Sequence, residues 1–503
     1  MNCIGAKTST SQSFAMLTRD TTHTLTEQLA ARFAERIRSR LLPAGARLPS
    51  VRACAAQQSV SPYTVVAAYD LLQAQGLVEA RRQRGFYVRD YVAKAVVTAP
   101  PAAPAAKDKT LKDAVSLSLP AASARINATS LIRGMMHKAT HPQPGAGMFP
   151  PEWLQNQFLQ SALRKVVGSD ALHAMHWSYG APMGDELLRA LLADRLKELG
   201  LPVGVEQVMT TMGATQGLDI VSRTLLKAGD AVMVEEPGWS VEFARLAALG
   251  MQVLPVPRGP DGPDLAVMRH YCETHAPKLY VSVSVLHNPT SYSLHPAAAH
   301  QVLQLAQAFN FYIVEDDTYS HIAPEHATRL SVLDGLKRSI YVSGFAKILA
   351  PNWRVGYMVA PPDLVDRMLD TKLLSTLTSP AMMERAMALC MENGQLRRHI
   401  ERMRSHLVQA RKHSVPLALE SGCRFVTEPA GMFGWVDTGM DTEVLAQRML
   451  DENYLIAPGS LFHASRQPST LMRINYACTQ DPSFWRVYQR VRAEFTQAEP
   501  MPR

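Results

Sequence analysis

The chain has 503 residues, a formal net charge of +8 and an apolar fraction of 47%. This length exceeds one ordinary domain, and the apolar fraction allows a large core, which excludes a mainly disordered chain. The sequence contains no uncharged apolar run of about 18 residues, so we expect no membrane-spanning helix and no membrane partner. Its start lacks a basic stretch followed by an apolar one, so we expect no secretory signal.

Six cysteines are scattered along the chain, and none forms a Cys-x-x-Cys pair. This spacing argues against a metal site, and free thiols fit a reducing cytoplasm. The positive charge is concentrated near the start, because residues 1–90 carry twelve Lys and Arg against six Asp and Glu, which leaves +2 for the rest. Such asymmetry favours an anionic partner for the N-terminal part, although a solubilising surface would give the same charge.

Near the start of the chain, apolar residues recur at helical spacing from Leu25 to Leu42, which predicts an amphipathic helix. A second short helix is expected after Pro49, and a third from Pro62 to about Gln75, since Ser61 is a good N-cap. Residues 77–88 predict two short strands around a basic turn.

Beyond residue 90 the composition changes twice. An Ala/Pro-rich stretch predicts a semi-rigid linker. From about residue 125, short β-branched runs alternate with helical patterns, which predicts an α/β fold whose mostly parallel sheet is covered by helices on both faces. A smaller α+β subdomain is expected after about residue 395. The expected strands are 208–210, 231–236, 279–286, 311–316 and 339–343. The expected domains are a flexible arm at 1–22, a three-helix domain with a hairpin at 23–90, a linker at 91–124 and a large α/β domain at 125–500.

Three helices followed by a hairpin form the winged helix-turn-helix pattern, in which the last helix enters the major groove of DNA. Tyr63 and Thr64 at the start of that helix can contact bases or phosphates. A winged helix that contacts protein instead remains an alternative. The other candidate DNA contacts lie at helix starts and in the wing: Arg47, Ser50, Arg52, Ser61, Arg81, Arg82 and Arg84.

Four motifs occur in one register over residues 41–88: P-x-G-x-R-L-P-S-x-R, V-S-x-x-T-V-x-x-A-Y, G-L-V and G-F-Y-V. This stretch resembles the GntR-type winged helix of bacterial regulators, and the resemblance implies double-stranded DNA as a partner. Pro62 stands where that family often has Arg, which removes one phosphate or base contact.

Polar residues follow several predicted strands, where ligands of open α/β sheets bind. Gly213, Ala214 and Thr215 open a helix whose backbone N–H groups could hold a phosphate, although an ordinary tight turn would look the same. Trp239 follows the next strand and could stack on a heteroaromatic ring, or it could be a core aromatic residue.

The next strand ends carry residues suited to an aldehyde-bearing aromatic ligand. Asn288 could bond a phenolic oxygen, and Asp316 at a strand end needs a cation such as a protonated pyridine nitrogen. Lys347 could form a Schiff base if it is partly desolvated beside a cation, although most lysines on helices are simply solvated. Arg354 could clamp a phosphate.

This set, in this order, resembles the fold-type I enzymes of the aspartate aminotransferase family, which use pyridoxal 5'-phosphate (PLP). The resemblance spans about residues 170–480. It implies that Lys347 carries PLP as an internal aldimine and that Asp316 pairs with the pyridine nitrogen. It also implies the remaining contacts: Tyr319 and Asn288 to the ring oxygen, Trp239 stacked on the ring, and Gly213, Ala214, Thr215, Ser343 and Arg354 to the phosphate.

Two further segments match that family. Tyr179 in WSYGAPMG would reach the phosphate bound by the partner subunit, and Arg473 in MRINYA would clamp the carboxylate of a substrate or effector. The sequence departs from the family at Gly344, where Ser is common, so one phosphate bond is in doubt. Asp316 and Asp317 are both available for the pyridine nitrogen, and the spacing to Tyr319 favours Asp316.

The combination resembles the MocR family of cytoplasmic transcription regulators, in which a head-to-tail homodimer senses PLP or an amino compound. Two other possibilities stay open. The chain could chiefly be an aminotransferase acting on an amino acid or related amine, so enzymatic activity is left undecided. The large domain could also be a degenerate module that never holds PLP.

Overall fold

A computed structural model describes residues 24–39, 41–42, 44–58, 60–81, 84–89, 128–136, 142–168, 178–324 and 326–498. The chain divides into two units, residues 1–141 and 142–503, and each is described by itself. The arm expected at 1–22 and the linker expected at 91–124 lie outside the described residues. In the ranges that are described, no helix has the length and apolar character needed to cross a bilayer.

The first unit has the helices and the hairpin that the sequence predicts. Their bounds are α1 (Leu25–Arg38), α2 (Val51–Gln58), α3 (Pro62–Ala74), β1 (Val78–Arg81) and β2 (Gly85–Val88), with α4 (Ala128–Met136) further along. The first helix ends four residues earlier than expected, because the Ser39 N–H closes the last turn on the Glu35 carbonyl. Strands β1 and β2 pair antiparallel around the turn before Gly85.

One aromatic cluster holds the three-helix unit together. The Tyr69 ring on α3 meets the rings of Phe33 on α1 and Phe86 on β2 edge-on, with centroids 5.6 and 5.0 Å apart. The Tyr69 hydroxyl donates to the Pro49 carbonyl at 2.9 Å, so the buried phenol is satisfied. These contacts fix α3 against the hairpin.

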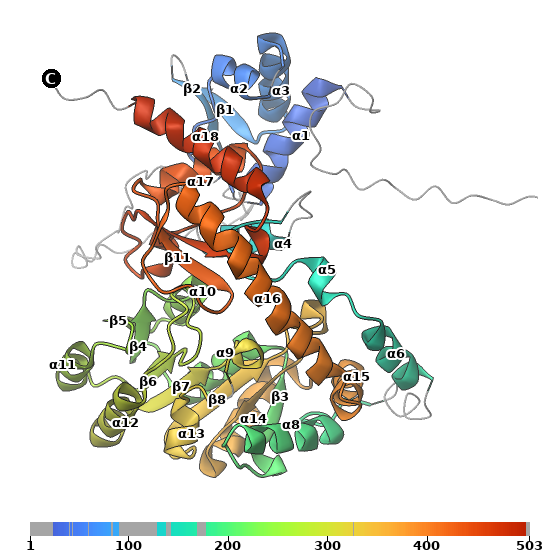
Figure 1. The fold of residues 1–503 in the computed structure, drawn as a ribbon, viewed down its shortest axis with the longest axis vertical. Coiled ribbons are helices and arrows are strands. Elements are labelled where there is room, and N and C mark those ends of the chain that lie inside the picture. Colours follow the sequence, from blue (N-terminus) through green and yellow to red (C-terminus); the bar gives the residue numbers. More distant parts are fainter. Residues whose placement is uncertain are drawn as a thin grey trace, which may run out of the picture. The chain divides into compact units, whose positions relative to one another are not determined.

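The second unit is built on a seven-stranded sheet in the order β3–β9–β8–β7–β6–β4–β5 (Figure 1). The strands are β3 (Val208–Thr211), β4 (Ala231–Glu236), β5 (Gln252–Pro257), β6 (Leu279–Ser282), β7 (Tyr312–Asp316), β8 (Ser339–Gly344) and β9 (Gly356–Val359). Strand β9 is antiparallel to both neighbours and the other pairs are parallel, which confirms the mostly parallel sheet. Strands β5 and β9 were not predicted.

Strand β6 is shorter than the predicted 279–286. The Val283 N–H leaves the ladder and donates to the Glu235 carboxylate at 2.9 Å. Leu286 then adopts a φ of +49°, which no strand allows. The prediction of an eight-residue strand is therefore wrong at its carboxyl end, where the chain turns towards Asn288.

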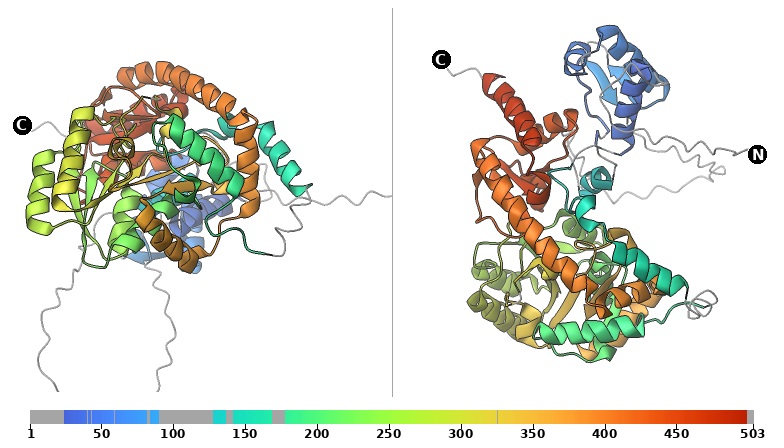
Figure 2. Two further views of the ribbon diagram at one scale, coloured as in Figure 1. Left: turned by 90° about the horizontal axis from the view of Figure 1, so that it is seen from below. Right: turned by 45° about the vertical axis from the view of Figure 1, so that its right-hand side comes forward.

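Helices cover both faces of this sheet (Figure 2). Along β9, Tyr357 and Val359 enter one buried cluster and Met358 enters the other, as the alternation of a doubly covered strand requires. The helices are α5 (Pro151–Leu154), α6 (Gln157–Val167), α8 (Glu186–Glu198), α9 (Ala214–Leu225), α10 (Ser240–Ala248), α11 (Leu265–His275), α12 (Pro296–Phe309), α13 (Leu330–Asp334), α14 (Pro362–Thr376) and α15 (Ala381–Glu392). Short 3₁₀ helices occupy Val205–Gln207, Ser320–Ile322, Pro351–Trp353, Gly459–Phe462 and Tyr476–Cys478.

The expected α+β subdomain follows a long helix, α16 (Gln395–Glu420), which runs from α15 to a second sheet (Figure 1). That antiparallel sheet has the order β10–β11–β13–β12. Its elements are β10 (Arg424–Phe425), β11 (Phe433–Asp437), β12 (Ala457–Pro458), β13 (Leu471–Asn475), α17 (Thr442–Asp451) and α18 (Pro482–Ala498). Strand β13 carries the predicted carboxylate clamp, Arg473.

Candidate functional site

The residues predicted to bind PLP follow the ends of the central strands. Gly213 follows β3, Trp239 follows β4, Asn288 follows β6, Asp316 ends β7 and Lys347 follows β8. Because these strands are parallel, their carboxyl ends lie along one edge of the sheet. The fold therefore gathers side chains that lie up to 134 positions apart in the sequence, from Gly213 to Lys347.

A phosphate-sized cradle lies where β3 meets α9. Gly213 has a φ of +85°, and the free N–H groups of the first turn of α9 follow it at Ala214 and Thr215. The Arg354 side chain lies over this turn, where its Nη2 donates to the Met212 carbonyl at 2.8 Å. A Cβ added at Gly213 would lie 2.5 Å from that Nη2, so only glycine lets the guanidinium approach. A helix N-terminus beside an arginine suits a phosphate.

A small cavity beside the cradle is lined by Trp239 and by three carboxylates, those of Glu235, Glu242 and Asp316. Two of these acids have arginine partners. Arg258 pairs with Glu235, and Arg245 donates to Glu242 through Nε at 3.0 Å and Nη2 at 2.5 Å. A buried carboxylate without such a partner is unfavourable, so the third acid needs a cation from elsewhere.

Asp316 is that third acid. Its carboxylate accepts the Thr318 N–H at 3.1 Å, and no salt bridge to it is found within the described part of the chain. Burial, helped by the charge of Glu242, raises the pKa of Asp316 to about 6. A protonated pyridine nitrogen would supply the missing positive charge, so the residues present fit PLP.

The neighbouring Asp317 serves another face of the sheet. Its carboxylate accepts from Arg329 Nε at 2.6 Å and from the Tyr341 hydroxyl at 2.9 Å, and all three side chains are buried. Its charge is therefore already neutralised. This geometry favours Asp316 over Asp317 as the partner of the ring nitrogen.

Lys347 lies at the opening of the site and is partly buried. Its Nζ donates to the Gly147 carbonyl at 2.8 Å. Burial, together with the charges of Arg473 and Arg354, lowers the pKa of Lys347 to about 8, while Asp316 opposes the shift. A neutral amine is the nucleophile in Schiff-base formation, so this environment prepares the lysine for an aldehyde.

The pH dependence of PLP attachment follows from that lowered pKa. The neutral fraction of the Lys347 amine rises as the pH passes through about 8, whereas an ordinary lysine needs a pH near 10.4. We expect the rate of PLP attachment to rise about tenfold per pH unit below 7 and to level off above 9. Stopped-flow absorbance of the empty protein mixed with PLP measures this rate, and a rise that continues unchanged to pH 10 would contradict the lowered pKa.

Arg473 is buried at the other side of the site. Its Nη1 donates to Asn288 Oδ1 at 2.9 Å, its Nη2 donates to the Gly145 carbonyl at 2.6 Å, and its Cζ lies 4.3 Å from the Phe433 ring centroid. Its buried Nε has no hydrogen-bond partner. Burial lowers the pKa of Arg473 to about 10, so the group stays cationic at neutral pH. Such an anchored fork suits a ligand carboxylate.

Residues 144–148, here called the crossing segment, lie over these side chains. The carbonyls of Gly145 and Gly147 accept from Arg473 and Lys347. Asn475 Nδ2 donates to the carbonyls of Ala146 and Met148 at 3.0 and 2.8 Å. The sequence could not reveal these contacts, because backbone carbonyls carry no side-chain signature.

Three further predicted contacts with PLP remain open. Ser343 was predicted to hold the phosphate, but its hydroxyl donates to the Asp317 carbonyl at 2.9 Å and lies 3.3 Å from Ser320 Oγ. In the structure this hydroxyl joins the ends of β7 and β8, so its contact with a phosphate stays a prediction. Tyr319 is buried, as a ring-oxygen partner should be, and burial raises its pKa. Tyr179 is 77% exposed, so its contact with a partner subunit stays a prediction.

Glu242 was not predicted as a site residue. Glu242 lies three residues after Trp239 in the first turn of α10, so the two side chains share one face of the chain there. That spacing was an available signal. His287 lies beside Glu235, and burial lowers its pKa to about 3, so it is neutral there.

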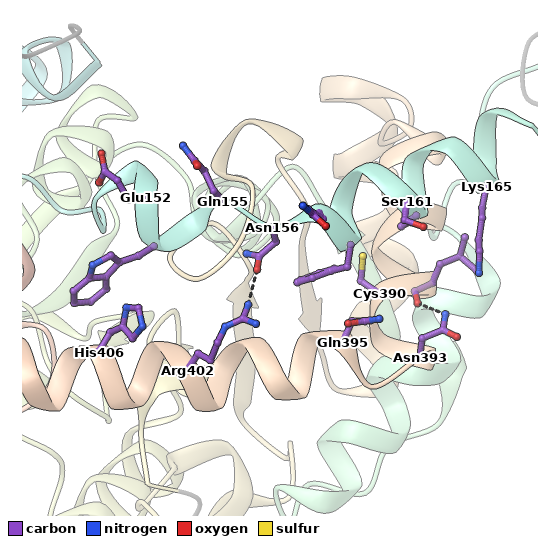
Figure 3. A pocket seen from close by; sticks show the side chains of 15 residues that line it. Glu152, Gln155, Asn156, Ser161, Lys165, Cys390, Asn393, Gln395, Arg402 and His406 are labelled. Atoms are coloured by element: carbon purple, nitrogen blue, oxygen red, sulfur yellow. Dashed lines mark hydrogen bonds between the residues drawn. The ribbon is translucent and has the colours of Figure 1, made fainter.

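A separate polar groove of about 690 Å³ lies over α5, α6, α15 and α16 (Figure 3). Arg402 Nη2 donates to Asn156 Oδ1 at 2.6 Å across it, which ties the start of α6 to α16. Lys165 projects from α6 at its edge. None of the predicted cofactor ligands lines this groove, so its side chains are suitable controls for the site.

Two of the predicted DNA contacts at helix starts cap their own helices. Ser61 Oγ accepts the Thr64 N–H at 3.1 Å and caps α3, and Ser50 Oγ accepts the Ala53 N–H at 3.2 Å and caps α2. These two serines therefore use their side chains to orient helices. Tyr63 is 82% exposed and projects from the first turn of α3, which contains no Lys or Arg.

The predicted arginine contacts flank α3. Arg81 on β1 bonds Glu79 at 2.9 Å and lies 4.5 Å from the Tyr87 ring centroid, so it is held along the hairpin. The backbone of Arg47 pairs with that of Tyr87 in an isolated antiparallel β-bridge. The side chains of Arg52 and Arg84 are exposed. The predicted contact at Arg82 lies outside the described residues.

Comparison with known proteins agrees with this geometry. Residues 158–490 match the family described as aminotransferase class I and II, and residues 25–88 match the bacterial regulatory proteins of the gntR family. The α-aminoadipate aminotransferase LysN from Thermus thermophilus has the same fold, with a TM-score of 0.67, 24% identity, and coverage of 75% of this chain and 97% of LysN. The large unit is therefore an aminotransferase-type domain, the class that uses PLP.

Two regulators resemble the chain over most of its length. The uncharacterized HTH-type transcriptional regulator YdcR of Escherichia coli is 26% identical over 465 residues, covering 90% of this chain and 94% of YdcR. The probable rhizopine catabolism regulatory protein MocR of Rhizobium meliloti is 28% identical over 447 residues, covering 88% and 85%. The chain belongs to the aminotransferase class I and II family, its residues 25–88 match the gntR family, and its whole length is similar to MocR-type regulators.

Proposed function

We propose that this chain is a PLP-dependent, DNA-binding transcription regulator whose large unit senses PLP or an amino compound. The observation that carries the proposal is a site fitted to PLP on the same polypeptide as a gntR-family head. A head-to-tail homodimer belongs to the proposal, with Tyr179 reaching towards the phosphate of the partner subunit.

Each residue of the site would contact a particular part of PLP or of the amino compound. PLP supplies an aldehyde and an electron-withdrawing ring when it is bound. Lys347 offers a neutral amine, Asp316 holds a proton-bearing ring nitrogen, and Trp239 stacks on the ring. Arg354 and the first turn of α9 hold the phosphate, and Asn288 and Tyr319 bond the ring oxygen. Arg473 holds the carboxylate of an amino compound.

The crossing segment offers a route from the site to the rest of the chain. In the structure Lys347 and Arg473 donate to the Gly147 and Gly145 carbonyls. A cofactor on Lys347 and a carboxylate on Arg473 compete for those donors, so the segment gains freedom when the site is filled. This segment follows directly after the N-terminal unit in the chain. A ligand that favours one arrangement of the segment must shift DNA affinity if the head responds to it.

On the DNA side, α3 has no cationic side chain, so Tyr63 and Thr64 read bases through ring and hydroxyl contacts. The phosphate contacts fall to the exposed Arg47, Arg52 and Arg84 and to Arg81 on β1, and a contact from Arg82 stays a prediction of the sequence. Ser50 and Ser61 cap the N-terminal ends of α2 and α3, which would face the DNA backbone.

Fluorescence anisotropy with DNA from upstream of the protein's own gene tests the function. We expect PLP or an amino compound to change the dissociation constant at least fivefold, the lower range of measured couplings. Tyr63→Ala should weaken DNA binding about tenfold and leave PLP binding unchanged. Gln73→Ala, at the exposed far end of α3, is the matched control.

The opposite outcome points to a different role. The site also contains the amine, acid and arginine of an aminotransferase, Lys347, Asp316 and Arg473. Rapid amino-group transfer from ordinary amino acids, with no affinity for upstream DNA at any ligand concentration, would show that the chain is chiefly an enzyme.

A further inference from the structure

Glu242 is a buried carboxylate in the cofactor cavity for which the proposed function has no use. It lies in the first turn of α10 and is 4% exposed. It lines the same cavity as Trp239 and Asp316. We propose that Glu242 is a second acid of the cofactor site, whose fixed negative charge stabilises the positively charged ring of bound PLP together with Asp316.

The position of this carboxylate is fixed from outside the cavity. Arg245 donates to Glu242 through Nε at 3.0 Å and Nη2 at 2.5 Å. The same guanidinium donates to Ser222 Oγ at 3.0 Å and lies 3.5 Å from Asp219 Oδ1. Two helices, α9 and α10, thus hold Glu242 in place, and it cannot swing into solvent without breaking both bonds to Arg245.

The local charges leave a negative excess for the cofactor. Arg245 is shared between Glu242 and Asp219, and Arg223 also pairs with Asp219 at 2.7 Å. Arg223 is the closer partner of Asp219 and Arg245 is the closer partner of Glu242, which leaves Asp316 without a guanidinium partner among the described residues. The remaining negative charge lies where Glu242 and Asp316 face the same cavity, and a cationic ring nitrogen would neutralise it.

Lys347 acts on Asp316 with a positive charge and lowers its pKa, but the remaining charged and titratable groups around the cavity do not cancel this excess. Arg258 pairs with Glu235, and His287 is neutral because burial lowers its pKa to about 3. Burial raises the pKa of Asp316, and the charge of Glu242 adds to that rise. The groups that face Glu242 or line its cavity are Arg245, Asp219, Glu235, His287 and Asp316.

The test is the pH titration of the absorbance of the PLP-loaded protein. This inference rests on PLP binding and not on DNA binding. Removing a negative charge disfavours the protonated forms of the cofactor, so Glu242→Gln should lower the midpoint by about 0.5 to 1 pH unit and raise the PLP dissociation constant roughly fivefold. Glu242→Asp keeps the charge and should restore the midpoint. Glu242→Ala provides a second charge-free side chain if the amide impairs folding.

The matched control is Asp219→Asn. Asp219 contacts the same Arg245 but does not line the cavity, so its removal should leave the midpoint within about 0.2 pH unit of the wild type. An unchanged midpoint in Glu242→Gln, an equal shift in Asp219→Asn, or a wild-type protein that takes up no PLP would each overturn the inference. A normal titration without any DNA binding would instead refute the proposed regulator alone.

Discussion

The variant Lys347→Ala should take up PLP without forming a covalent link and should lose it on gel filtration. The mutation removes the amine whose pKa of about 8 allows it to react with an aldehyde at neutral pH. The phosphate cradle and Asp316 remain, so weak binding should persist with an affinity at least a hundredfold lower. Borohydride reduction followed by mass spectrometry should find cofactor on the wild type and none on the variant.

Two other lysines serve as a competing candidate and as a control for this prediction. Lys372 is buried, and burial lowers its pKa to about 8 as well, but its Nζ donates to the Pro182 carbonyl at 2.7 Å and it lines neither the cavity nor the cradle. Lys165 lies in the separate groove of Figure 3. Lys165→Ala should retain the covalent cofactor and the visible band. A band that survives in Lys347→Ala would show that the lysine is misassigned, and Lys372 would become the candidate.

Local patterns predicted most of the fold and the reactive residues. The three-helix head was readable because each helix has its own N-cap, period and stop within 14 residues, as in α3 after Ser61. Lys347, Asp316 and Arg473 were predicted because their motifs occur in the order of the aspartate aminotransferase family, since a single lysine or arginine carries little signal by itself. Strand β9 was missed because Gly356–Val359 is only four residues long and follows an irregular turn.

What the sequence could not reveal depends on contacts between distant segments. Arg473 reaches the Gly145 carbonyl across 328 positions, and Lys347 reaches Gly147 across 200. The direction of the Ser343 hydroxyl depends on the pairing of β7 with β8 and not on its own motif. The charge of the cavity likewise depends on which acid each arginine contacts. Only the folded chain determines that Glu235 and Glu242 have arginine partners and that Asp316 has none among the described residues.

The two adjacent aspartates should respond in opposite ways to the same chemical change. Asp317 neutralises buried Arg329, so Asp317→Asn leaves an uncompensated charge and should lower the free energy of unfolding by about 3 to 5 kcal/mol. Asp316 has a folded-state pKa of about 6, above its value in an unfolded chain, so the empty protein loses stability as the pH rises from about 4 to 6. Asp316→Asn removes that effect and should stabilise the empty protein at pH 7 by about 1 to 2 kcal/mol.

The affinity for PLP should fall in Asp316→Asn and stay nearly normal in Asp317→Asn. Asp316→Asn deprives the ring nitrogen of its carboxylate and should weaken PLP binding about a hundredfold, while Asp317→Asn should bind PLP nearly normally wherever it is folded. Denaturant unfolding of the empty proteins and PLP titration at pH 7 measure both effects. If Asp317→Asn loses PLP and keeps its stability, the two carboxylates have exchanged roles, and Asp317 is the partner of the ring nitrogen.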